Sequence, residues 1–246
     1  MVEDASERPQ VLVVTCPDEA ERKALISQNN IDEHTLASSL DPDELSRLEF
    51  EPDHIAIIHK RPQNYSGGDR LQFKTSSAGL FIFKERLIIV LSEPITLFVG
   101  RQFSRVGSLN DLALRVIYNA ISHFLEHLKG INMITTELEG KINTSVENRY
   151  LLQLFSLEKS LVYYLNAITT NGVLIERIRH ASAKIGFSQE ESEFLDDMTI
   201  ENSQCLKQAE IHSNIIASLM DARASIVGNN LNALMKTLNI ITIGIM

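Results

Sequence analysis

Residues 189–246, the last segment of the chain, constrain the fold more than any other part. They include no proline and only two glycines, so nothing in them signals the end of a helix. The last charged residue is Lys236, and the ten residues after it would span roughly 15 Å as a helix. A hydrocarbon core needs about twice that length. We therefore expect one very long helix that ends in the first half of a transmembrane segment.

One face of this expected helix is polar or small along most of its length. At about 100° per residue, the residues within about 40° of Asp221 follow a single stripe. They are Ser203, Lys207, Glu210, Asn214, Ala217, Asp221, Ser225, Gly228, Asn232, Met235, Asn239, Ile243 and Met246. A solvated face of an amphipathic helix gives the same pattern. Because Asn232 and Asn239 lie where the helix turns apolar, the stripe favours a water-filled lumen.

Composition narrows the classes of function. The 246 residues carry a formal net charge of −9, which argues against a nucleic-acid surface and is compatible with cation handling. The polar N-terminus has no secretory signal, so we expect a cytosolic location for the visible part of the chain. The two cysteines lack metal-type spacing. No nucleophile, phosphate-binding or zinc-protease motif is present, so we expect no enzyme. His123 and His127 have no third ligand in sequence, and a solvated or core-edge pair is expected.

The order of elements predicts an α+β fold. Residues 1–106 read as a small α/β domain with a largely antiparallel sheet, 107–188 as a helical hairpin region, and 189–246 as the stalk helix. The strands are expected at Val11–Cys16, Arg47–Glu51, His54–Lys60, Leu71–Thr75, Leu80–Lys84 and Arg86–Leu91. Short helices are expected at Asp18–Gln28, Ile31–Leu40 and Pro42–Leu45.

Two helices are expected before the stalk, at Ser108–Lys129 and about Ile131–Ile185, the second with a bend near Asn171 and Gly172. Ser188 and Glu191 have the spacing of a capping box at the start of the stalk. Long helices of this kind pack against one another.

The segment from Ser218 to Ile241, with its small-residue and asparagine run followed by Asn232-x-x-Met235-Lys236-x-Leu238, closely resembles the stalk end of the CorA family of divalent-cation channels. The layout of the whole chain is also similar to that family. Asn239 stands where the family pattern has threonine. The resemblance implies a homopentamer in the cell (inner) membrane, with this portion on the cytoplasmic side and the membrane helices continuing beyond Met246. The transported ion would be Mg²⁺, with Co²⁺ or Ni²⁺ as further permeants.

The resemblance also implies roles for residues of the stalk. Asp221 corresponds to an acidic ring, Asn232 to a polar pore ring, Met235 and Leu238 to an apolar gate, and Met246 to a further pore methionine. Five carboxylates concentrate cations, and an amide ring can hold a hydrated Mg²⁺ through its water shell. Asp221 as a solvated acid, or Met235 and Leu238 as helix–helix core, are the alternatives.

In the family, a regulatory Mg²⁺ bridges a stalk carboxylate of one subunit and a carboxylate of a neighbour's small domain. The stalk half matches Asp197, with Asp196 beside it. The stretch that matches the other half has Ser38 and Ser39 and lacks both family acids. We expect Asp41, Asp43 and Glu44, which follow closely, to compensate. The alternative is that the two stalk acids only solvate the helix.

Two other functions remain open at this point. One is a Zn²⁺ transporter of the same superfamily. The other is a soluble helical adaptor that oligomerises through its last helix.

Overall fold

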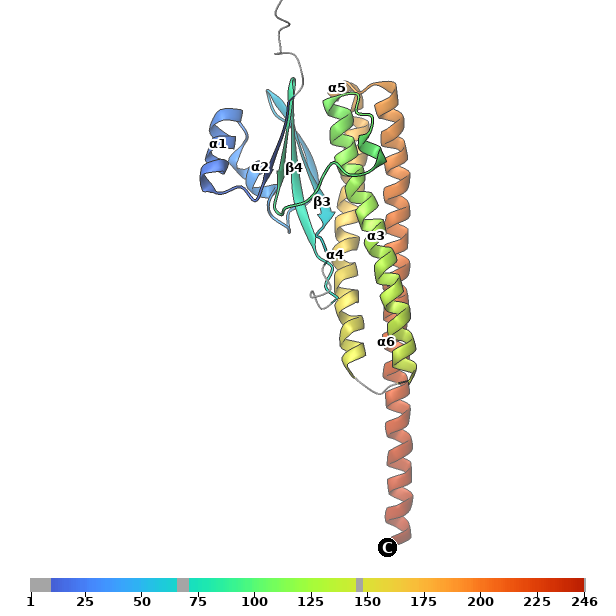
Figure 1. The fold of residues 1–246 in the computed structure, drawn as a ribbon. Helices are drawn as coiled ribbons and strands as arrows, with labels where there is room; N and C mark the ends of the chain where they lie inside the picture. Colours follow the sequence, from blue (N-terminus) through green and yellow to red (C-terminus); the bar gives the residue numbers. More distant parts are fainter. Residues whose placement is uncertain (1–9, 66–70, 145–147, 246) are drawn as a thin grey trace, which may run out of the picture.

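The computed structural model describes residues 10–65, 71–144 and 148–245 of the chain. Its elements follow in the order β1 (Gln10–Thr15), α1 (Glu19–Asn29), α2 (Glu33–Ser38), β2 (Arg47–Phe50), β3 (His54–Pro62), β4 (Thr75–Phe83), β5 (Arg86–Leu91), η2 (Arg101–Phe103), α3 (Leu109–Thr144), α4 (Asn148–His180), α5 (Ser182–Ile185) and α6 (Gln189–Ile245). Figure 1 shows an N-terminal α/β layer beside a bundle of long helices, beyond which α6 continues alone. The expected α+β class is confirmed.

The sheet has the strand order β1-β5-β4-β3-β2. Strand β1 pairs parallel with β5, and the other three pairings are antiparallel, as the sequence indicated. Strand β3 outlasts β2: the pairing with β2 ends at Ile58, whereas the pairing with β4 continues to Pro62. The backbone of β3 after Ile58 therefore needs another partner on its outer side.

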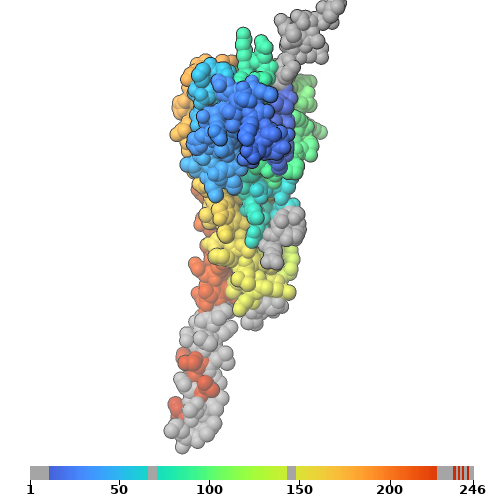
Figure 2. Space-filling view, turned by 90° about the vertical axis from the view of Figure 1, so that its left-hand side faces the viewer, coloured from blue at the N-terminus to red at the C-terminus, as the bar shows by residue number. Residues whose placement is uncertain are grey.

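The two faces of the sheet bury separate cores, because alternate residues of a strand point to opposite faces. Ala56, Phe81 and Ile88 face α1 and α2. Ile57, Leu80 and Ile89 face the long helices. In Figure 2 the layer of α1 and α2 faces the viewer and lies over the upper part of the bundle. Gly79 lets α2 approach the sheet closely, because a Cβ there would lie 2.6 Å from the Cβ of Ser39.

Helices α3, α4 and α6 pack against one another, and the last described residue of α6 that is buried is Ile216. Leu219 and Met220 still pack against the core. Residues 221–245 span roughly 38 Å at the usual rise, and over this part the helix leaves the bundle behind (Figure 1). The expected stalk helix is therefore present as one element of 57 residues.

The predicted capping box at the start of α6 is confirmed. The Glu191 N–H donates to Ser188 Oγ at 3.2 Å, and the Ser188 N–H donates to Glu191 Oε2 at 2.7 Å. Glu191 also accepts a hydrogen bond from Ser108 Oγ, just before α3. One carboxylate thus joins the starts of two helices, which fixes the upper end of the bundle.

Several expected boundaries were wrong. Helix α3 runs through Gly130 to Thr144. A lone glycine in an apolar helical pattern is tolerated. Gly130 marks no close approach, since nothing lies within 4 Å of a Cβ built there. Helix α4 passes Gly172 without interruption. Strand β4 is one strand from Thr75, since its small residues pair with β3, and Ala78 and Gly79 pair with β5 as well. Residues 42–45 form a turn and no helix.

Candidate functional site

The expected ion-path residues lie on the part of α6 that leaves the bundle. Asp221 is exposed, and the exposed fractions of Met235 and Leu238 are 56% and 61%. Asn232 lies on the same helix between Asp221 and Met235, and Met246 falls outside the described residues. These positions share one rod, and the side chains of its own bundle do not bury Asp221 or Met235. The rod is free to present them to other copies of the chain.

Across residues 10–65, 71–144 and 148–245, we find no helix with an apolar stretch long enough to cross a membrane.

The stalk acids Asp196 and Asp197 are both exposed on the upper part of α6. Asp196 Oδ1 lies 3.9 Å from an Arg179 guanidinium nitrogen, a loose contact at the surface. Burial raises the pKa of Tyr118 on α3, and the negative charges of Glu201 and Asp197 raise it further. Asp197 has no ion pair among the described residues, which leaves its carboxylate available to a partner.

The acids of the 41–44 turn differ in how far they are engaged. Glu44 Oε1 lies 2.6 Å from Arg47 Nη1, and its other oxygen accepts a hydrogen bond from Ser38 Oγ at 3.2 Å. Asp41 accepts a hydrogen bond from the N–H of Asp43 at 2.9 Å. Arg47 thus neutralises Glu44, while the carboxylates of Asp41 and Asp43 are exposed. Of the three expected ligands, these two have the freer oxygens.

Lys60 is the cation that sequence reasoning missed at this turn. Its side chain is 2% exposed, and its Nζ donates to the Pro42 carbonyl at 2.6 Å and to Ser77 Oγ at 3.0 Å. Burial lowers the pKa of Lys60, while the charges of the 41–44 acids act in the opposite direction. The ammonium therefore lies beneath the acidic turn and helps to fix it. Strand periodicity alone gave no signal that this lysine would be buried.

Within one chain the two halves of the expected sensing site do not meet. The 41–44 turn belongs to the α/β layer, whereas Asp197 lies on α6, and α3 and α4 stand between the two (Figure 1). In the described part of the chain no three His, Cys, Asp or Glu side chains form a group that could hold a metal ion. A site that combined Asp197 with Asp41 or Asp43 would need two copies of the chain.

A second polar group lies between the sheet and the helices. His59 and Arg61 on β3 are 1% and 7% exposed, and His59 Nδ1 has no hydrogen-bond partner. His123 and His127 on α3 have ring centroids 4.3 Å apart, and His127 Nδ1 lies 2.5 Å from the hydroxyl of Tyr164. Burial and the Arg61 charge lower the pKa of His59 to about 3. We therefore assign His59 to the interior in its neutral form.

The comparison with known families matches nearly the whole chain. A model of the family described as CorA-like Mg²⁺ transporter protein matches residues 11–246. The cobalt/magnesium transport protein CorA of Methanocaldococcus jannaschii is 23% identical over 241 residues, which cover 92% of this chain and 72% of that protein.

Solved structures give the same fold. The CorA magnesium transporter from Methanocaldococcus jannaschii matches with a TM-score of 0.81 at 20% identity, over 94% of this chain and 74% of that one. The cytoplasmic domain of ZntB from Vibrio parahaemolyticus matches with a TM-score of 0.67 at 14% identity, over 92% and 91%. At these identities the structures show the fold alone. It is the match along residues 11–246 that places this chain in the CorA-like Mg²⁺ transporter family.

Proposed function

We propose that this chain is the cytosolic part of a divalent-cation channel that works as a homopentamer in the cell (inner) membrane. One observation carries the proposal: α6 leaves its own bundle and exposes large apolar side chains, with exposed fractions of 56% for Met235, 71% for Ile240 and 75% for Ile243. Exposed apolar surface of this extent calls for a partner. Family membership makes further copies of α6, and the membrane, the partners that fit.

Five α6 helices side by side would surround a path for hydrated ions. Asp221 would form a ring of carboxylates that attracts cations, and Asn232 a ring of amides that holds them through their water shells. Met235 and Leu238 would close the path by excluding water, and Met246 would extend this apolar lining. Mg²⁺ is the leading transported ion, and Co²⁺ and Ni²⁺ are further candidates. The description of the matching family and the name of the Methanocaldococcus jannaschii relative support Mg²⁺ and Co²⁺.

Cation uptake tests this function. The full product of the gene should restore Mg²⁺ uptake in cells that lack their own magnesium transporters. Asp221→Ala should lower the initial uptake rate about tenfold at low Mg²⁺, because the carboxylate ring no longer raises the local cation concentration. Asp221→Glu should retain the rate, and the difference should shrink at saturating Mg²⁺.

Absence of uptake by the wild type, or unchanged uptake by Asp221→Ala, would contradict the proposal. Uptake of Zn²⁺ that Mg²⁺ does not compete with would assign the protein to zinc transport instead. An adaptor would transport neither ion.

Cysteine cross-linking tests the arrangement of the α6 helices. In a Cys16→Ser background, Met235→Cys should form cross-links between subunits in membranes, and a short bismaleimide should give a covalent dimer, because each chain offers one accessible thiol. Lys23→Cys is the matched control: it is exposed on α1, which lies far from α6 (Figure 1), and should stay monomeric on the gel. Met235→Cys chains that remain monomeric would argue against neighbouring α6 helices.

We further propose that Mg²⁺ regulates the assembly by bridging Asp197 of one subunit to Asp41 and Asp43 of the next, with Asp196 and Glu44 nearby. In the intact transporter, Mg²⁺ should slow proteolysis of the cytosolic part, and Asp197→Ala should remove most of this protection, because a hard cation needs several carboxylate oxygens. Glu193→Ala, an exposed acid one turn away, is the control. Equal protection in both variants would exclude Asp197 as a ligand.

A further inference from the structure

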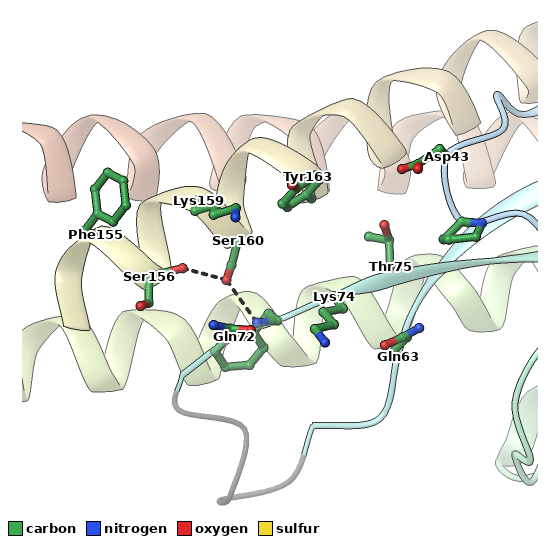
Figure 3. A pocket seen from close by; sticks show the side chains of 12 residues that line it. Asp43, Gln63, Gln72, Lys74, Thr75, Phe155, Ser156, Lys159, Ser160 and Tyr163 are labelled. Atoms are coloured by element: carbon green, nitrogen blue, oxygen red, sulfur yellow. Dashed lines mark hydrogen bonds between the residues drawn. The ribbon is translucent and has the colours of Figure 1, made fainter. Parts of the chain in front are cut away.

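A cavity of about 430 Å³ lies on the outer side of α4, where the chain leaves β3 and enters β4 (Figure 3). Its residues come from α4, from the segments beside β3 and β4 and from the 41–44 turn, and none of them belongs to α6. A cavity of this volume is within the range that holds small organic ligands. It is separate from the residues proposed for the ion path.

The floor of this cavity is fixed by hydrogen bonds and ring packing. The N–H of buried Phe73 donates to Ser160 Oγ at 3.0 Å, and Ser160 Oγ donates to the Ser156 carbonyl at 2.8 Å. Tyr65 stacks on Phe73 with ring centroids 4.4 Å apart. These contacts tie the start of β4 to α4. The cavity therefore exists before a ligand arrives, which lowers the cost of binding.

The walls of the cavity carry two lysines without acidic partners. Lys159 lies on α4 and Lys74 just before β4, on opposite walls (Figure 3). Neither lysine side chain has a hydrogen bond or ion pair with any residue that the structure describes. Asp43, at one end, is the one carboxylate among the lining residues. In a chain with a net charge of −9, this pocket is a local excess of positive charge that suits an anion.

Two exposed aromatic rings stand beside these charges. Phe155 and Tyr163 lie four residues before and after Lys159, so all three side chains share one face of α4. Their exposed fractions are 59% and 47%. The amides of Gln63 and Gln72 also line the cavity and can both donate and accept hydrogen bonds. Planar rings and amides together suit a flat heteroaromatic group.

We propose that this cavity binds a nucleoside polyphosphate, with the phosphates on Lys74 and Lys159 and the base against Tyr163. Lysine serves as a point charge for phosphate, and hydrogen bonds between charged groups are the stronger class. The ring of Tyr163 offers a stacking surface for any base. Such a site would let the cytosolic nucleotide pool bind this domain independently of the ion path.

Isothermal titration calorimetry of the whole chain with ATP, in buffer without divalent cations, tests the site. We expect saturable binding at millimolar nucleotide or below. Lys74→Ala and Lys159→Ala should each weaken the affinity about tenfold, and Tyr163→Ala by a similar factor, whereas Lys159→Arg and Tyr163→Phe should retain it. Lys129→Ala, an exposed lysine on α3, should bind as the wild type does. Unchanged thermal midpoints would show that the variants are folded.

Two partial ligands separate the contributions of charge and ring. Tripolyphosphate and adenosine should each bind more weakly than ATP. No saturable binding of ATP, or equal affinity in the wild type and the two lysine variants, would overturn the site. Equal affinity for tripolyphosphate and ATP would overturn the nucleoside assignment. Loss of self-association in Phe155→Ala without any effect on ATP would show that a second copy of the chain covers this face, and the proposal would fall.

Discussion

Replacing Asn171 with alanine should lower the free energy of unfolding by about 3–5 kcal/mol. Asn171 lies on α4 and is fully buried. Its Oδ1 accepts hydrogen bonds from the Lys60 N–H and from Ser46 Oγ, both at 2.8 Å, and its Nδ2 donates to the Lys60 carbonyl at 2.8 Å. The side-chain amide thus takes the place of the missing neighbour strand where β3 outlasts β2. Alanine would leave a buried N–H and a buried C=O without partners.

Urea unfolding at neutral pH measures this effect. Asn166→Ala, at an exposed position of the same helix, is the matched control and should change the stability by about 0.5 kcal/mol or less. The same loss should expose the junction of the sheet and α4, so amide exchange of Lys60 should accelerate more than that of the β5 interior. A stability of Asn171→Ala within about 1 kcal/mol of the wild type would refute this role of the amide.

Acidification should destabilise the fold by about 3–6 kcal/mol between pH 7 and pH 4. Burial and the Arg61 charge lower the pKa of His59 to about 3. Burial, His123 and Arg61 lower the pKa of His127 to about 4. In the unfolded chain both groups titrate near 6.5. Between these values the unfolded state binds more protons than the folded state, so the free energy of unfolding falls as the pH falls.

The charged groups near His59, His123 and His127 set how strongly the free energy of unfolding falls as the pH falls. Arg61 on β3 disfavours any added positive charge, while Glu126 on α3 offsets part of it at His123. Burial raises the pKa of Glu93, just after β5, so this carboxyl gains its proton more readily in the folded state and offsets part of the loss. Tyr164 on α4 is neutral over this range because burial raises its pKa.

Urea unfolding at a series of pH values measures the slope. His127→Gln should flatten the dependence of stability on pH, since one proton fewer is taken up on unfolding. His34→Gln, at an exposed position of α2, should leave this dependence unchanged. Equal stability of the wild type at pH 4.5 and pH 7 would contradict the assignment of neutral buried histidines.

The elements that could be predicted from sequence depend on local rules. The capping box at Ser188 needs only neighbours along the chain, and the continuous apolar run of β5 is typical of a strand that is buried on both faces. The division of α3 was wrong because Gly130 was given the weight of a helix end, although the apolar pattern continues past it. The expected strands near β4 omit residues 76–79, which lack the large apolar side chains typical of a strand, yet these small residues are buried and pair with β3.

The contacts that could not be predicted join distant segments. The side chain of Asn171 accepts a hydrogen bond from the N–H of Lys60, 111 residues away in the sequence. The Lys60 ammonium in turn donates to the Pro42 carbonyl. Neither residue type signals burial, since a lone asparagine or lysine is usually exposed. The two walls of the cavity, at Lys74 and Lys159, are likewise brought together only by the packing of α4 on the sheet. The roles of Asp197 and Asp221 depend on neighbouring copies of the chain and stay predictions.

Because α6 is one continuous helix, a tilt of its upper part moves its far end. Its upper part is packed in the bundle as far as Met220, and roughly 38 Å of helix extends past that point. A pivot of about 5° there would move the far tip by roughly 3 Å, about the width of a water molecule. A small change in the packing of α3, α4 and the upper part of α6 would thus displace the far end of α6 by about the thickness of an ion's hydration layer.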